Sequence, residues 1–128
     1  MNRLLLDTHV LLWWLADNAR IGPKTVERIS DMRNEIFVSA VTSWEIAIKK
    51  KIGKLEAPDN IDGIVEDEGF SKLPVTLHHG EIAGGLPLHH KDPFDRMLVA
   101  QAKTEALYLL TDDGSIRRYD VPVISPLD

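Results

Sequence analysis

The 128-residue sequence contains no cysteine. This absence excludes disulfides, thiolate metal sites and a cysteine nucleophile, so any bound metal must use oxygen or imidazole ligands. No stretch approaches the roughly 20 consecutive apolar residues that span a membrane. Net positive charge is also missing, because the formal net charge is −5. We therefore expect a soluble, cytoplasmic protein without a membrane partner, and not a generic nucleic-acid binder that depends on widespread positive charge.

The chain has the length of one domain, and no repeat or linker divides it, so we expect a single domain over residues 1–128. Five short apolar runs have strand length, and they cover residues 3–6, 36–38, 73–75, 107–110 and 121–124. Helical periodicity lies between most of them, over residues 23–32, 42–51, 60–68, 77–84 and 93–105. The alternation predicts a three-layer α/β/α fold, in which helices cover both faces of a mostly parallel sheet of about five strands.

Four acidic residues follow or adjoin these predicted strands. Asp7 and Asp113 come just after apolar runs, and Glu45 lies early in the helix after the second run. Asp95 lies at the start of the helix over residues 93–105. In open α/β sheets, ligands bind outside the carboxyl ends of the strands. We therefore expect the four carboxylates to converge on one crevice.

Each acid also has a purely structural interpretation. Thr42 and Glu45 have the spacing of a capping box, in which Glu45 would bond only to backbone. Asp92 and Pro93 form a typical helix start that places Asp95 where the helix dipole favours an acid. Asp7 has the position of a helix cap, and residues 112–114 have the composition of a turn.

Taken together, the acids favour a metal site over four unrelated structural roles. Carboxylates that converge on one crevice repel one another unless protons or cations neutralise their charge. Mg²⁺ and similar hard cations prefer oxygen ligands, and they commonly bridge carboxylates to substrate phosphates. The pattern therefore indicates the hydrolysis of a phosphate ester by metal-activated water.

Four strings of residues resemble the PIN domain nucleases, and among them the VapC-type toxins of toxin–antitoxin pairs. The strings are LLLDTH at 4–9, SWEIAIK at 43–49, LPLHHKDPFDR at 86–96 and LTDD at 110–113. The resemblance implies an α/β/α nuclease in which Asp7, Glu45, Asp95 and Asp113 bind Mg²⁺ or Mn²⁺. It implies endonucleolytic cleavage of RNA that leaves a 5′ phosphate. It also implies a homodimer and a protein antitoxin that inhibits the toxin.

Several neighbours of this acidic quartet are secondary candidates. Asp112 competes with Asp113 for the fourth position, and Asp92 either only orients Asp95 or also supports the metal. Arg96 is a candidate phosphate contact, with a structural ion pair as its alternative. The remaining secondary candidates are Thr8, directly after Asp7, and Thr111, two residues before Asp113.

Other basic and histidine residues are less informative. The run Lys49, Lys50, Lys51 and Lys54, with Arg117 and Arg118, is either an RNA contact or a solvated surface. The adjacent histidine pairs at 78–79 and 89–90 do not predict a zinc site. Neighbouring residues on a helix point about 100° apart, and the usual zinc chelate needs two histidines at i and i+4.

Three alternatives remain open at the level of sequence. A catalytically inactive PIN fold would serve as an RNA- or protein-binding module. A receiver-like phosphotransfer domain would need a second acid directly beside Asp7, where this sequence has Thr8. A haloacid-dehalogenase-type phosphatase would need an aspartate at the position of His9.

The segment 10–16 is apolar on nearly every side, which indicates contact with another chain.

Overall fold

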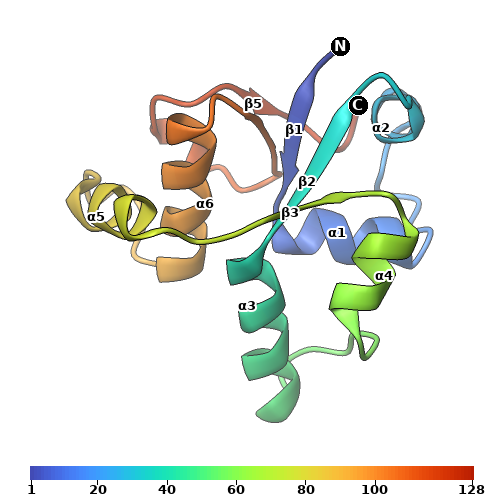
Figure 1. Ribbon diagram of the computed structural model, residues 1–128, viewed down its shortest axis with the longest axis horizontal. Helices are drawn as coiled ribbons and strands as arrows, with labels where there is room; N and C mark the ends of the chain where they lie inside the picture. The colour runs from blue at the N-terminus through green and yellow to red at the C-terminus, as the bar shows by residue number, and fades with distance from the viewer.

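The computed structural model describes residues 1–128 and contains one parallel sheet (Figure 1). The order of its strands is β3-β2-β1-β4-β5, and all four neighbouring pairs are parallel. The strands are β1 (Arg3–Leu6), β2 (Glu35–Ser39), β3 (Ser71–Leu73), β4 (Tyr108–Leu110) and β5 (Val123–Ile124). Because β1 is central, the residues that follow it lie in the middle of the carboxyl edge of the sheet.

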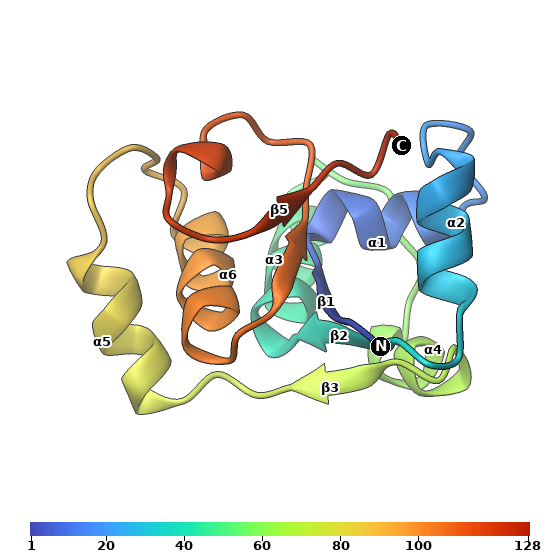
Figure 2. The ribbon, with the colours of Figure 1, turned by 90° about the horizontal axis from the view of Figure 1, so that it is seen from above.

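Helices cover both faces of the sheet (Figure 2). The helices α1 (Thr8–Leu15), α2 (Pro23–Ser30) and α4 (Ile61–Asp67) lie on one side, and α5 (Leu77–Gly85) and α6 (Pro93–Thr104) lie on the other. Helix α3 (Ala40–Lys51) continues directly from β2, and a short 3₁₀ helix, η1 (Ile116–Arg118), precedes β5. The predicted α/β/α fold is confirmed, and every strand pair is parallel.

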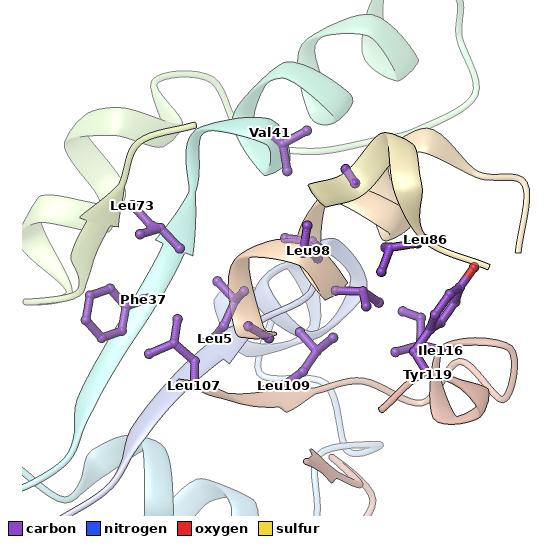
Figure 3. Packing of buried hydrophobic residues seen from close by; sticks show 14 residues of the cluster. Leu5, Phe37, Val41, Leu73, Leu86, Leu98, Leu107, Leu109, Ile116 and Tyr119 are labelled. Carbon is purple, nitrogen blue, oxygen red and sulfur yellow. The ribbon is translucent and has the colours of Figure 1, made fainter. Parts of the chain in front are cut away.

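Alternation along the strands divides the core into two clusters. Leu4 and Leu6 of β1 pack with α1, α2 and α4, whereas Leu5 packs with α5 and α6 (Figure 3). All three leucine side chains are fully buried, which stabilises the fold by about 2 kcal/mol for each side chain. The buried β1 therefore holds the next residue, Asp7, on a rigid support.

The predicted elements differ from the observed ones in two places. The run 73–75 was expected to be a strand, but β3 ends at Leu73 because Pro74 has no N–H for a strand ladder. The expected buried face of the helix at 42–51 is wrong. Trp44 and Ile52 are exposed by 61% and 58%, and Val41 and Ile46 fill the core instead.

Helix α1 contains most of the apolar segment 10–16, for which the sequence suggested a contact with another chain. Val10 and Leu11 are buried within this chain, whereas Trp13 and Trp14 are half-buried. Trp14 donates a hydrogen bond from Nε1 to Glu68 Oε2 at 3.2 Å. Much of the apolar surface is thus already covered. None of the helices combines the length and the apolar character that a membrane span requires.

Candidate active site

An acidic cleft of about 250 Å³ lies at the carboxyl ends of the central strands. All four predicted quartet members line it, together with three further acids or hydroxyls that the sequence suggested as secondary candidates. The lining residues are Asp7, Thr8, His9, Val10, Trp13, Glu45, Lys49, Asp92, Asp95, Asp112 and Asp113. Six of these side chains are carboxylates and only one is a lysine. The cleft would therefore repel an RNA phosphate unless a cation were bound in it.

Asp7 is both the cap of α1 and, with Glu45, one of the two buried acids of the cleft. Its Oδ1 accepts a hydrogen bond from the Val10 N–H at 2.8 Å, and its Oδ2 accepts one from Thr111 Oγ1 at 2.5 Å. The side chain is nearly buried. Burial raises the pKa of the Asp7 carboxyl, because these hydrogen bonds only partly compensate for lost hydration. The Asp7 carboxylate can therefore cap α1 and still bind a metal ion in the cleft.

Glu45 is buried in the second turn of α3, so the capping-box interpretation is wrong. The helix begins at Ala40 with Ser39 as its cap. Glu45 Oε1 accepts a hydrogen bond from Thr8 Oγ1 at 2.6 Å, and Oε2 pairs with Lys49 Nζ one turn later. The hydrogen bond to Glu45 raises the pKa of Lys49. Thr8 and Lys49 therefore fix the Glu45 carboxylate at the cleft wall.

Asp92 caps α6 as predicted. Its Oδ1 accepts hydrogen bonds from the N–H groups of Phe94 at 2.8 Å and Asp95 at 3.1 Å, and Pro93 follows it at the first helical position. This start of α6 places the Asp95 carboxylate in the cleft. Burial, together with the negative charge of Asp92, raises the pKa of Asp95 to about 7.

Asp113 and Asp112 both line the cleft, but only Asp113 joins the other acids through hydrogen bonds. The Asp113 N–H donates to Thr111 Oγ1 at 3.1 Å, and its Oδ1 accepts from the Ser115 N–H at 2.8 Å. Thr111 thus connects Asp7 with Asp113. Asp112 is exposed. These contacts favour Asp113 as the fourth acid.

His90 is the site residue that the sequence argument missed. Its Nε2 lies 2.8 Å from Asp95 Oδ2 and 3.1 Å from Asp113 Oδ2. These three residues form the one group of potential ligands whose donor atoms all lie within 4.8 Å of one another, so Asp7 and Glu45 stand apart from it. Burial opposes protonation of His90, but the two carboxylates outweigh that effect and raise its pKa.

The cleft fits a divalent cation of the Mg²⁺ or Mn²⁺ type. Its donors are carboxylate oxygens with one imidazole nitrogen, and no thiolate is available. Asp7 and Asp95 are both held away from water near other acids, and the pKa of each is raised. Burial is the main cause of both shifts, and repulsion from neighbouring acids adds to it; a bound cation would remove that repulsion.

Arg96 does not line the cleft, and the hypothesis that it contacts phosphate loses its support. Its guanidinium donates to four backbone carbonyls at the end of α5 and in the segment between α5 and α6, at distances of 2.9 to 3.2 Å: Ala83, Leu86, Pro87 and His90. The predicted alternative, an ion pair, is not formed either. Tyr119 Oη accepts the His90 N–H at 3.0 Å and donates to the Pro87 carbonyl at 2.8 Å. Arg96 and Tyr119 therefore hold the segment that carries His90.

We expect Arg96→Gln to lower the free energy of unfolding by about 2 kcal/mol, because several hydrogen bonds from a charged donor are lost. Thermal unfolding monitored by circular dichroism measures the change. Arg118→Gln is the matched control, since Arg118 is exposed in η1 and should leave stability unchanged. A variant that keeps wild-type stability but binds RNA more weakly would contradict this structural role.

The predicted basic run divides between different surfaces. Lys49 lines the acidic cleft, whereas Lys50 pairs with Asp59 outside it. Arg117 and Arg118 are exposed and do not line the cleft. Lys49 is therefore the one lysine of this run with direct access to a substrate in the cleft.

Comparison with known proteins identifies the family. A sequence model of the PIN domain matches residues 4–122. The chain belongs to the PIN domain family. Ribonuclease VapC22 of Mycobacterium tuberculosis is a relative that is 26% identical over 125 residues, which cover 95% of each protein.

Solved structures agree with this PIN fold. A chain from the VapBC2 structure of Rickettsia felis, bound to a DNA fragment from its promoter, superposes with a TM-score of 0.70 at 13% identity, covering 96% of this chain and 98% of the other. A chain from a toxin–antitoxin complex of Klebsiella pneumoniae gives a TM-score of 0.63 at 18% identity, covering 96% and 97%. At these identities the similarity concerns the fold alone.

Proposed function

We propose that this PIN domain protein is a metal-dependent endoribonuclease and the toxin of a VapC-type toxin–antitoxin pair. One observation carries the proposal. Asp7, Glu45, Asp95 and Asp113, from four separate segments of the chain, line a single cleft at the carboxyl edge of the sheet. A relative over nearly the whole chain is named as a ribonuclease, which supports RNA as the substrate.

Each acid has a distinct part in this mechanism. Asp7, Asp95 and Asp113 would hold Mg²⁺ or Mn²⁺, and Glu45 would orient the attacking water through the carboxylate that Thr8 and Lys49 fix. When bound, the cation supplies easier deprotonation of water and stabilisation of charge on the phosphate. The ammonium group of Lys49 is paired with Glu45 at the wall of the same cleft, so its part in this mechanism is to hold that carboxylate in place. The products would carry a 5′ phosphate and a 3′ hydroxyl.

The partners follow from the same proposal. Similar folds occur in toxin–antitoxin complexes, which supports a protein antitoxin that covers the cleft. An arginine from that partner would suit six lining carboxylates. We also propose a homodimer, whose contacts would cover exposed apolar groups such as Trp44, and a cytoplasmic location, where RNA is available.

The test is cleavage of a panel of labelled RNAs by antitoxin-free protein, in Mn²⁺ or Mg²⁺ and in chelator. We expect cutting with metal and none in chelator. Cutting that persists in chelator would contradict the metal-dependent mechanism. If folded, metal-binding protein cuts no RNA of the panel, the catalytically inactive binding module becomes the better interpretation.

A further inference from the structure

His90 has no assigned role in the proposed function, yet it lies at the centre of the tightest ligand group in the molecule. Its Nε2 is within hydrogen-bond distance of both Asp95 and Asp113. The imidazole is 21% exposed, and the two carboxylates that it contacts, Asp95 and Asp113, both line the cleft. No other histidine of the chain belongs to such a group.

We propose that His90 is a protein ligand of the metal, so that the site prefers Mn²⁺ and related transition-metal ions to Mg²⁺. This inference rests on the proposed function, because it concerns the ion that the acidic residues hold. Carboxylates suit Mg²⁺ and Mn²⁺ alike, whereas an imidazole ligand favours a transition metal. A His–Asp–Asp set is therefore selective where an all-carboxylate set is not.

The separations between His90 and the two carboxylates fit the coordination of one ion. Adjacent ligands of an octahedral ion with bonds of about 2.1 Å lie about 3.0 Å apart. The observed separations from His90 Nε2 are 2.8 Å to Asp95 Oδ2 and 3.1 Å to Asp113 Oδ2. Asp7 lines the same cleft, and Thr111, which donates to its carboxylate, also accepts the N–H of Asp113.

The segment that carries His90 is fixed independently of the cleft. Arg96 donates to the His90 carbonyl at 3.2 Å, and Tyr119 Oη accepts the His90 N–H at 3.0 Å. Asp92 N–H approaches His90 Nδ1 at 3.5 Å, which is a long and weak contact. In this contact Nδ1 is the acceptor, so the proton that Nδ1 must carry when Nε2 binds metal would cost only this one weak contact. The rigid backbone keeps the imidazole in place.

The experiment measures Mn²⁺ binding to the complete protein without RNA. Pulsed electron paramagnetic resonance detects a coordinated ¹⁴N nucleus directly, and labelling with ¹⁵N-histidine changes that signal. We expect a histidine nitrogen signal in the wild type, its loss in His90→Asn, and Mn²⁺ affinity weaker by about tenfold or more. Mg²⁺ affinity should fall less than Mn²⁺ affinity.

Two matched controls separate His90 from its neighbours. His89→Asn removes a ring that packs on Tyr119 at 5.1 Å, and His9→Asn removes the one histidine that lines the cleft itself. Both should retain the nitrogen signal. Circular dichroism confirms folding, and the ¹⁵N-labelled wild type provides a test that needs no variant.

The outcomes distinguish this proposal from the proposed function. Mn²⁺ bound without a histidine nitrogen signal, or bound more tightly by His90→Asn, would overturn the ligand role of His90 while leaving metal-dependent cleavage intact. Loss of the signal in His9→Asn instead would also overturn it. Failure of the wild type to bind any divalent ion would overturn both.

Discussion

Asp7→Asn is expected to lower the rate of RNA cleavage by about 10³-fold or more while the fold is retained. The change removes the negative charge of a buried carboxylate that is proposed to bind the metal. It keeps the structural contribution, because asparagine caps helices about as well as aspartate. The amide oxygen can still accept the Val10 N–H that Asp7 Oδ1 accepts in the native protein. Single-turnover cleavage and thermal unfolding, measured on the same preparation, separate the two effects.

Two further variants make this prediction specific. Asp7→Ala removes both charge and cap, so it should lose activity equally and also lose about 1 kcal/mol of stability. Asp67→Asn changes an exposed acid at the end of α4 and should cut RNA like the wild type. Activity of Asp7→Asn within a few fold of the wild type would remove Asp7 from the metal site. If Asp7→Asn, Asp7→Ala and the wild type all cut RNA at the same rate, the activity would come from a contaminating nuclease.

The fold and the placement of the acids were predictable because both depend on local pattern. Short apolar runs alternate with amphipathic helices, and that alternation alone indicates a parallel sheet. In such a sheet the positions after the strands meet at one edge, so Asp7 and Asp113 converge without any knowledge of tertiary contacts. Asp92 and Pro93 likewise mark the start of α6 in the sequence itself.

The features that sequence reasoning missed depend on contacts between distant segments. His90 was judged as half of an adjacent pair on a helix, but residues 86–92 are not helical, and the relevant spacing is five residues to Asp95. Arg96 follows Asp95 in sequence but points away from the cleft to carbonyls of the preceding segment. The face of α3 that Trp44 occupies was misjudged for the same reason. Periodicity gave one apolar stripe, and packing against both core clusters selected another.

Metal-free protein is expected to lose stability as the pH rises from 5 to 8, and a divalent cation should reverse the loss. The pKa of Asp95 is raised from 3.8 to about 7, and the pKa values of Asp7 and His90 are raised as well. Each of these groups therefore binds protons more tightly in the folded state than in the unfolded state. Their contribution to stability is complete at low pH and disappears as the pH rises through the folded-state values.

The expected size of this loss is about 2 kcal/mol between pH 5 and pH 8, or roughly 6–8 °C in melting temperature. This loss is about half of the free energy that the pKa shift of Asp95 alone would give, because Asp95 and His90 share a proton and titrate together. Thermal unfolding in chelator and in Mn²⁺ across this range measures it. Asp95→Asn should flatten the pH dependence in chelator, whereas Asp112→Asn, an exposed acid of the same cleft, should keep it. A wild-type protein that is equally stable at both pH values in chelator would contradict this electrostatic description. The cation should stabilise most at pH 8, where the acids are ionised and their mutual repulsion is strongest.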